Sequence, residues 1–231
     1  MWDNPRLLNA AAGFLVGLAA LAFAAAAAYW LAHSALFPVR VVELRTTLKQ
    51  VPRAEVAGTL ASVGRGNFFA APIDELRSAL ERLPWVRRAA VRRVWPDGLE
   101  VSIEEHVPLA RWAAGGLVNQ QGERFAGDAA AELPLFSGPA GTEAEVARRY
   151  TRFSQLARPL GSTIARLTLS ARLAWELRLA NGLELKLGRD ADAAEARLAR
   201  FVASPEASGL ARLGATVDLR YANGFSVRGK S

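Results

Sequence analysis

Cysteine is absent from this sequence, and histidine occurs only twice. The absence of cysteine excludes thiolate nucleophiles, cysteine metal sites and disulfide frameworks, while it leaves the redox compartment open. With 231 residues, the chain is long enough for one or two domains with hydrophobic cores of their own.

Few residues could serve as the groups of an enzyme. His33 and His106 are the only imidazoles. The run Glu104-Glu105-His106 stands at a predicted strand end, where neighbouring side chains point to opposite faces and cannot converge on one metal. The glycines of residues 64–66 join two predicted helices, and no phosphate-binding loop or nucleophile elbow is present. The sequence therefore predicts no catalytic, cofactor or metal site.

One apolar segment near the N-terminus indicates where in the cell the chain is located. Residues 7–32 carry no charged side chain, and this stretch exceeds the roughly 20 residues that a helix needs to cross a bilayer. We expect a transmembrane helix over residues 11–32 behind a cytoplasmic tail of residues 1–10, with Arg6 favouring a cytoplasmic N-terminus. The alternative is a cleaved signal peptide, although its apolar region is usually only about 7 to 15 residues long. Gly13 and Gly17 form a G-x-x-x-G step on which another helix could pack.

Basic residues exceed acidic ones by 29 to 22, which gives a net charge of +7. An acidic partner, an anionic lipid surface or nucleic acid would complement this charge. The arginines are scattered among hydrophobic residues, as on the solvated faces of ordinary helices and strands. A body held beyond the membrane would rarely meet nucleic acid, so the sequence favours a protein or a lipid headgroup.

The part after the membrane segment predicts an α+β fold in two domains. In residues 37–107, an extended stretch at 39–45 precedes helices that begin at Pro52 and Ile73. Two strands follow, at 85–95 and 99–104, joined by a turn at Pro96-Asp97-Gly98. This β-α-α-β-β order predicts two helices on a three-stranded sheet.

Residues 108–231 predict a second domain, built on a mixed sheet with flanking helices. Thr142 and Glu145 form a capping-box pattern for a helix that runs to Arg158. Alternating residues at 175–179 and 183–187 flank Asn181-Gly182 and predict a hairpin, and a helix with an apolar stripe follows it. A final pair of strands is expected at 217–221 and 225–228, around Asn223-Gly224.

Several motifs occur together in the order found in one protein family. Residues 83–86 (LPWV), 91–92 (VR), 95–97 (WPD) and 107–112 (VPLARW) resemble the end of the POTRA domain of the FtsQ/DivIB family and its entry into the second domain. Residues 187–189 (LGR), 200–201 (RF) and 217–221 (VDLRY) resemble the C-terminal β-domain of the same family. The resemblance covers roughly residues 35–228, behind a single apolar segment.

The resemblance implies a non-enzymatic scaffold of the bacterial division machinery. Such a protein is a single-pass protein of the inner membrane with its N-terminus in the cytoplasm and its bulk in the periplasm, at the division septum. It implies that the POTRA domain and membrane segment contact FtsK and other division proteins, and that the C-terminal domain binds FtsB with FtsL. It implies no cofactor and no nucleic acid.

In this family the FtsB segment is added beside the last strand of the sheet. The resemblance therefore assigns partner contact to the residues that match at this edge, which are Arg189, Arg220, Tyr221, Asn223, Gly224 and Phe225. The arginines are expected to meet acidic side chains of the partner. The sequence departs from well-studied members after the last strand, where residues 228–231 (RGKS) replace a tryptophan and a polar tail.

Two other functions fit parts of the sequence. One is a POTRA-type chaperone or assembly module of outer-membrane protein export, which would be expected to carry repeated POTRA units or a membrane barrel. The other is a membrane-tethered extracytoplasmic hydrolase, which turnover by the purified protein would reveal.

Overall fold

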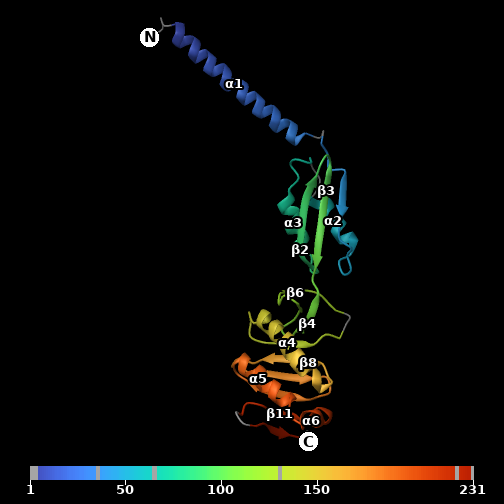
Figure 1. Cartoon of the computed structure of the whole chain (residues 1–231). Helices are drawn as coiled ribbons and strands as arrows, with labels where there is room; N and C mark the ends of the chain where they lie inside the picture. The colour runs from blue at the N-terminus through green and yellow to red at the C-terminus, as the bar shows by residue number, and fades with distance from the viewer. Residues whose placement is uncertain (1–4, 35–36, 64–66, 130–131, 222–223, 230–231) are drawn as a thin grey trace. The chain divides into compact units, whose positions relative to one another are not determined.

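A computed structural model describes residues 5–34, 37–63, 67–129, 132–221 and 224–229 of the chain. The chain divides into two compact units, Met1–Glu105 and His106–Ser231. Figure 1 shows α1 followed by the two folded parts in chain order.

The first element is an apolar helix that no other part of its unit covers. Helix α1 spans Pro5–His33, and its window Asn9–Leu31 has a mean hydropathy of 2.1 with none of its residues buried. A helix of 29 residues is about 43 Å long, which exceeds the roughly 30 Å of bilayer hydrocarbon. Its side chains are apolar all round, as exposed Phe14, Leu15 and Phe23 illustrate. This confirms the predicted N-terminal apolar helix and is consistent with a single-pass membrane anchor.

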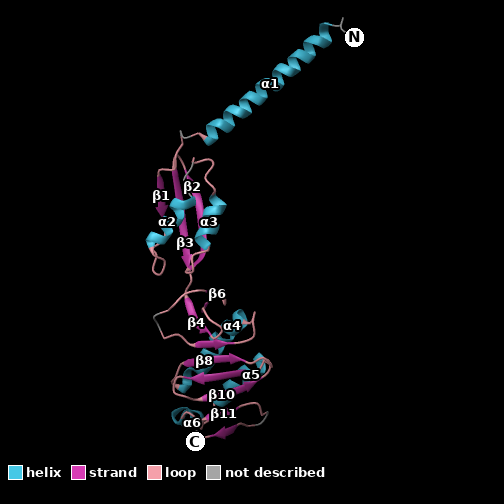
Figure 2. Ribbon diagram, turned by 180° about the vertical axis from the view of Figure 1, so that it is seen from behind, coloured by secondary structure: helices cyan, strands magenta, loops and turns pink. Residues whose placement is uncertain are grey.

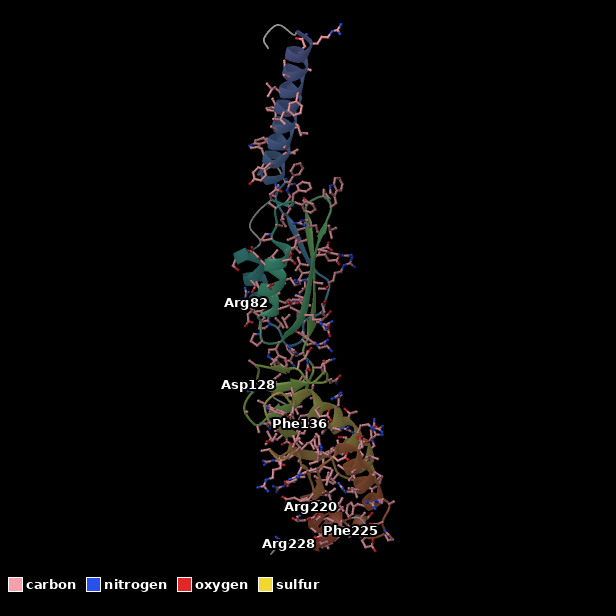
Figure 3. The ribbon with its side chains drawn as sticks, turned by 90° about the vertical axis from the view of Figure 1, so that its left-hand side faces the viewer. Arg82, Asp128, Phe136, Arg220, Phe225 and Arg228 are labelled. Atoms are coloured by element: carbon pink, nitrogen blue, oxygen red, sulfur yellow. The ribbon has the colours of Figure 1, made fainter. Side chains whose placement is uncertain are left out.

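Two helices pack on a small sheet in the rest of the first unit. The sheet has the order β1-β3-β2, with β1 parallel and β2 antiparallel to the central strand β3. Figure 3 shows both helices on one side of the strands, where Val56, Leu80 and Val101 are buried together. The elements are β1 Val41–Leu44, α2 Arg53–Val63, α3 Ile73–Glu81, β2 Val86–Val94 and β3 Gly98–Glu105. The predicted β-α-α-β-β order is confirmed; the glycine connection at 64–66 lies outside the described residues.

A carboxylate at the end of β3 fixes the loop that leads into α2. The Glu105 side chain accepts hydrogen bonds from the backbone N–H groups of Lys49, Gln50 and Val51, at 2.9, 2.9 and 2.8 Å. Burial alone would raise the pKa of Glu105, but these three N–H groups outweigh it and hold the pKa below its usual value. The ionised carboxylate therefore stabilises the fold of this unit.

We expect Glu105→Gln to lower the free energy of unfolding of the N-terminal unit by about 1 to 2 kcal/mol at pH 7, because bonds to a charged acceptor are lost. A lowered pKa in the folded state makes this contribution complete above the unfolded pKa of about 4.3, and the contribution disappears as the pH falls through the folded pKa. Chemical denaturation at pH 7 and at pH 3 measures both values. Glu43→Gln, on exposed β1, is the matched control and should change little; an equal loss in both variants would contradict the assignment.

The second unit is built on a mixed sheet. Over the described residues its strands follow the order β12-β11-β10-β9-β8-β7-β4-β5-β6. Helices α4 and α5 cover one face (Figures 1 and 2), where Phe153 and Phe201 are buried against Leu177. The strands are β4 Pro108–Trp112, β5 Leu117–Asn119, β6 Arg124–Phe125, β7 Leu135–Ser137, β8 Ile164–Leu169, β9 Trp175–Leu179, β10 Glu184–Gly188, β11 Thr216–Asp218 and β12 Ser226–Arg228. The helices are α4 Glu143–Ala157, the 3-10 turn Arg158–Leu160, α5 Ala191–Val202 and α6 Ala207–Leu213.

The alternation that predicted a hairpin is seen directly in burial. In β9, Trp175, Leu177 and Leu179 are buried, whereas Glu176 and Arg178 are exposed. Strand β10 pairs with β9 in antiparallel fashion, with Leu185 opposite Leu177. The opposite face of these strands is polar, so the hairpin prediction is confirmed.

Helix α4 confirms its predicted position but not its predicted cap. The Thr142 hydroxyl donates to the Pro139 carbonyl at 2.7 Å and makes no capping bond to the helix. Glu145 instead accepts from the guanidinium groups of Arg148 and Arg149. The capping-box prediction is wrong: the Thr142 backbone, at φ −97° and ψ 4°, lies outside the β region that aims an N-cap hydroxyl at the helix N–H groups, and two arginines bind the Glu145 carboxylate.

Candidate partner-binding edge

The two edges of the large sheet are unequal. At the β6 edge, Arg124 donates to the carbonyls of Gly115 and Ala114 at 2.9 and 2.8 Å, and Phe125 lies stacked under the His106 ring at 4.1 Å. At the other edge, all three residues of β12 are exposed. Strand β12, three residues long, is therefore the more exposed edge of the described sheet.

The direction of the β12 backbone groups follows from the ladder on its inner neighbour. The backbone of Ala215 and Leu219 bonds to β10, through Glu184 N to Ala215 O and Leu219 N to Lys186 O, each at 2.9 Å. By alternation, Val217 also faces β10, and Thr216 and Asp218 face β12. Their partners are Arg228 and Ser226, so the N–H and C=O of Val227 point outward from the sheet. An unpaired outward pair of this kind can bond to an added strand.

Apolar side chains surround this outward backbone. Val227 lies opposite buried Val217 and is itself 47% exposed. Phe225 is partly buried, and its ring packs edge-on against Phe201 of α5 at 5.4 Å. Tyr221 is 57% exposed. The edge therefore combines free backbone groups with accessible apolar surface.

Strand β11 ends earlier than predicted, and Arg220 explains why. The Asp218 carboxylate accepts from the Arg220 backbone N–H at 3.1 Å and from its guanidinium Nε and Nη2 at 2.9 and 2.6 Å. Leu219 still donates its backbone N–H to the Lys186 carbonyl, and this local turn bends the chain away from the ladder after it, so the strand predicted over 217–221 ends at 218. The hydrogen bond from Arg220 is the main cause that lowers the pKa of Asp218.

Glycine at position 188 makes room for that arginine. Gly188 has φ +85°, and a Cβ there would lie 3.1 Å from the Arg220 Cγ and 3.3 Å from an Arg197 nitrogen. Arg197 in turn donates to the Leu187 carbonyl at 2.8 Å. The Arg220 guanidinium is therefore bound by Asp218, and its aliphatic stem lies close to the Gly188 backbone of β10.

The structure brings most of the predicted contact residues to one end of this unit. Figure 3 shows Arg220, Phe225 and Arg228 together at the end that carries β12. Arg189 is exposed directly after β10 and beside the Gly188 contact, and Gly224 and Tyr221 are exposed near β12. Asn223 lies outside the described residues, as do Lys230 and Ser231 of the departing tail. The sequence reading missed Asp218, which the Asp-x-Arg spacing could have indicated, and Val227, whose outward backbone only the ladder reveals.

The side chains of Glu104, Glu105 and His106, considered above for metal binding, contact different partners. Glu105 binds loop amides, Glu104 pairs with Arg87 at 2.5 Å, and the His106 Nδ1 lies 2.9 Å from the Asn119 amide nitrogen. Among the described residues no group of three or more histidines, aspartates and glutamates could hold a metal ion.

Comparison with known proteins gives matches along the chain. Residues 37–106 match the family described as "POTRA domain, FtsQ-type", and residues 110–220 match "Cell division protein FtsQ/DivIB, C-terminal". The cell division protein FtsQ of Burkholderia pseudomallei is 40% identical over 237 aligned residues, which cover 99% of this chain and 94% of the relative. The FtsQ of Nitrosospira multiformis is 39% identical and covers 99% of both chains. That of Neisseria gonorrhoeae is 32% identical and covers 99% of this chain and 95% of the relative.

The chain belongs to the FtsQ/DivIB family. It is accordingly a non-enzymatic division protein, which agrees with the prediction of no catalytic site. The predicted fold is confirmed in both parts: a POTRA region of β-α-α-β-β order, and a C-terminal domain with a mixed sheet.

We expect Asp218→Asn to release the Arg220 side chain, because the ion pair loses its charge while the backbone turn keeps an acceptor. The order parameter of the Arg220 Nε–H group, measured by NMR relaxation at pH 6, should fall in the variant. In the unaltered chain the order parameter should fall only when Asp218 becomes protonated. Because its pKa is lowered, this happens below the ordinary aspartate pKa of about 3.9.

Glu176→Gln is the matched control for this prediction. Glu176 acts on Arg220 only through space, so its removal should leave the order parameter unchanged. A fall of equal size in both variants would show that general charge, not the Asp218 pair, holds Arg220 at the edge.

Proposed function

We propose that this chain is a bitopic scaffold of the division machinery, held in the inner membrane by α1 with its folded units in the periplasm at the septum. The names of its relatives and the uncovered apolar helix support this reading. In this proposal residues 1–10 lie in the cytoplasm and residues 11–32 span the membrane. Residues 37–107 form the POTRA domain, and residues 108–231 form the C-terminal domain.

The C-terminal edge is proposed to bind FtsB, which comes paired with FtsL. In this proposal an extended FtsB segment adds to β12, so its backbone pairs with the outward N–H and C=O of Val227. The observation that carries the proposal is this free backbone pair on an exposed three-residue edge. Main-chain bonds of this type supply affinity, and pockets for alternate side chains supply specificity.

Side chains around β12 suit such a partner. Arg189, Arg220, Tyr221, Asn223, Gly224 and Phe225 are the proposed contacts. Phe225, with its ring packed on Phe201, offers a fixed apolar surface at low entropic cost. The Arg189 side chain, exposed and without an ion-pair partner among the described residues, can meet an acidic group of the partner. Arg220 already forms an ion pair with Asp218, so an acidic group of the partner must compete with that carboxylate.

We expect Val227→Pro to weaken FtsB binding by about tenfold to a hundredfold, because proline lacks the outward N–H and leaves a carbonyl of the partner unpaired. The inner ladder should survive, since Ser226 and Arg228 make its bonds. Titration of the purified chain with an FtsB periplasmic segment measures the dissociation constant.

Val227→Thr is the matched control, because it keeps the N–H and the β-branched shape. It should bind within a few-fold of the unaltered chain. Unchanged binding by Val227→Pro, with the sheet intact by circular dichroism, would show that the partner does not pair with this edge.

The POTRA domain and the membrane segment are proposed to contact FtsK and other division proteins. The POTRA sheet supports this with edges of its own, at β1 and β2. In this arrangement early and late division proteins bind different parts of one chain.

We expect a fluorescent protein fused to the N-terminus to form bands at mid-cell in dividing cells. A POTRA module of outer-membrane protein export would instead give an even peripheral signal. Fluorescence microscopy separates the two, with a fusion to residues 1–36 alone as the control for membrane insertion without the folded units. An even signal from the full chain, inserted in the membrane, would contradict the division role.

A further inference from the structure

Exposed aromatic side chains gather at one end of the first unit's sheet. Phe37, Phe69 and Trp95 are 37%, 49% and 79% exposed. The rings of Phe37 and Phe69 meet edge to face at 5.3 Å, and Phe69 meets buried Phe68 in the same manner at 5.2 Å. Val41 and Val94 add exposed apolar surface at this end. Such a cluster on a folded domain marks an interaction surface.

Hydrogen bonds tie the three segments of this aromatic end together. Strand pairing places Val41 opposite Gly98, so the start of β1 lies beside the turn that carries Trp95. The backbone N–H of Phe68 donates to the Phe37 carbonyl at 2.7 Å. The Arg93 guanidinium donates to the carbonyls of Phe68 and Ala71, both at 2.8 Å. The aromatic end is therefore a built feature of the fold.

The chain itself limits how far this end can lie from α1. Helix α1 ends at His33, and Phe37 follows four residues later. Four residues of fully extended chain span at most about 14 Å. With α1 across a bilayer, Phe37 stays within about that distance of the helix end, and the rest of the aromatic end is attached to it.

The chemistry of this end fits the headgroup layer of a bilayer. Tryptophan and other amphipathic rings prefer this layer, where one side is apolar and the other wet. Exposed arginines lie in the same segments: Arg40 is 3.9 Å from the Asp97 carboxylate, Arg92 pairs with Glu100 at 2.8 Å, and Arg93 has no carboxylate within ion-pair distance among the described residues. Guanidinium groups bind phosphate readily. At the other end of β3, Lys49 and Gln50 are exposed, and Trp85 is partly buried against the core.

We propose that the aromatic end of the POTRA unit rests in the phospholipid headgroup layer of the bilayer that α1 spans. Trp95, Phe69 and Phe37 enter the layer, and Arg40 and Arg93 face its phosphates. This inference rests on the proposed membrane anchoring by α1. It makes the POTRA unit a second membrane contact that restrains the tethered body, in place of a domain that swings freely on four residues.

Spin labels can test this on the full chain, because it contains no cysteine and a single introduced one is labelled uniquely. Ala70 is exposed beside Phe69, so Ala70→Cys reports on the aromatic end without removing it. The labelled chain is placed in nanodiscs of phosphatidylethanolamine and phosphatidylglycerol, and collisions with oxygen and a water-soluble nickel complex are measured by power saturation. We expect the label at Ala70→Cys to collide with oxygen and to be several-fold better protected from nickel than the label at Gln50→Cys, at the opposite end of the sheet.

Two outcomes overturn the inference. Equal nickel access at Ala70→Cys and Gln50→Cys places the aromatic end in water. Protection at Ala70→Cys from both oxygen and nickel indicates burial against protein instead of lipid. A Trp95→Gln change in the Ala70→Cys chain should raise nickel access several-fold while circular dichroism stays constant; no rise would remove Trp95 from the contact.

A third label separates this inference from the anchoring on which it rests. Ala20 lies in the middle of the apolar window of α1, so Ala20→Cys should be accessible to oxygen and protected from nickel. If Ala20→Cys is exposed to nickel, the membrane anchoring itself fails. If Ala20→Cys lies deep and Ala70→Cys lies in water, the anchoring holds and the headgroup contact alone fails.

Discussion

The proposed binding end of this protein depends on one constraint: every backbone polar group of a sheet needs a partner, and the fold supplies those partners unequally at its two edges. At β6 the edge is two residues long, the Arg124 guanidinium binds carbonyls of the turn before β5, and the Phe125 ring is buried and stacked on His106. Strand β12 is the outermost strand at the other edge, and the N–H and C=O of Val227 point outward from the sheet. An exposed edge of this kind invites unwanted pairing unless it is shortened, charged or used. Here it is only three residues long and is flanked by arginines, so it can accept a chosen strand while it discourages others.

The charges at this edge favour selectivity over strength. Asp218 already neutralises Arg220, and the approach of the arginine over Gly188 fixes where its guanidinium lies. An incoming acidic side chain gains little net energy by replacing one carboxylate with another, since the existing pair must first be broken. A partner without an acid at that position loses nothing there, whereas a badly placed charge is repelled. Affinity must then come mainly from backbone bonds and from apolar contacts at Val227 and Phe225.

Regular alternation made much of the fold readable from the sequence. The β9–β10 hairpin follows from strictly alternating residues around Asn181-Gly182, and α1 follows from length and hydropathy alone. Local competition among polar groups was not readable in the same way. Strand β11 ends at Asp218, whose carboxylate binds the Arg220 backbone and side chain, and the Thr142 backbone, at φ −97° and ψ 4°, does not aim its hydroxyl at the first turn of α4. The edge position of β12 was expected from family resemblance, but the outward direction of Val227 depends on a ladder that only three dimensions show.

Two surfaces of the chain are left incomplete by its own packing, and each specifies what completes it. Helix α1 has no protein cover on any side, so only an apolar medium or another apolar helix can satisfy it. Strand β12 has outward backbone N–H and C=O groups that can bond to water or, in a regular ladder, to another strand. In the proposed arrangement, anchoring by α1 confines the chain to two dimensions, and this raises the effective concentration of the edge for any partner anchored in the same bilayer. An edge of modest intrinsic affinity is then sufficient for binding. Anchoring in a shared bilayer brings the two proteins together, and the edge determines which partner binds.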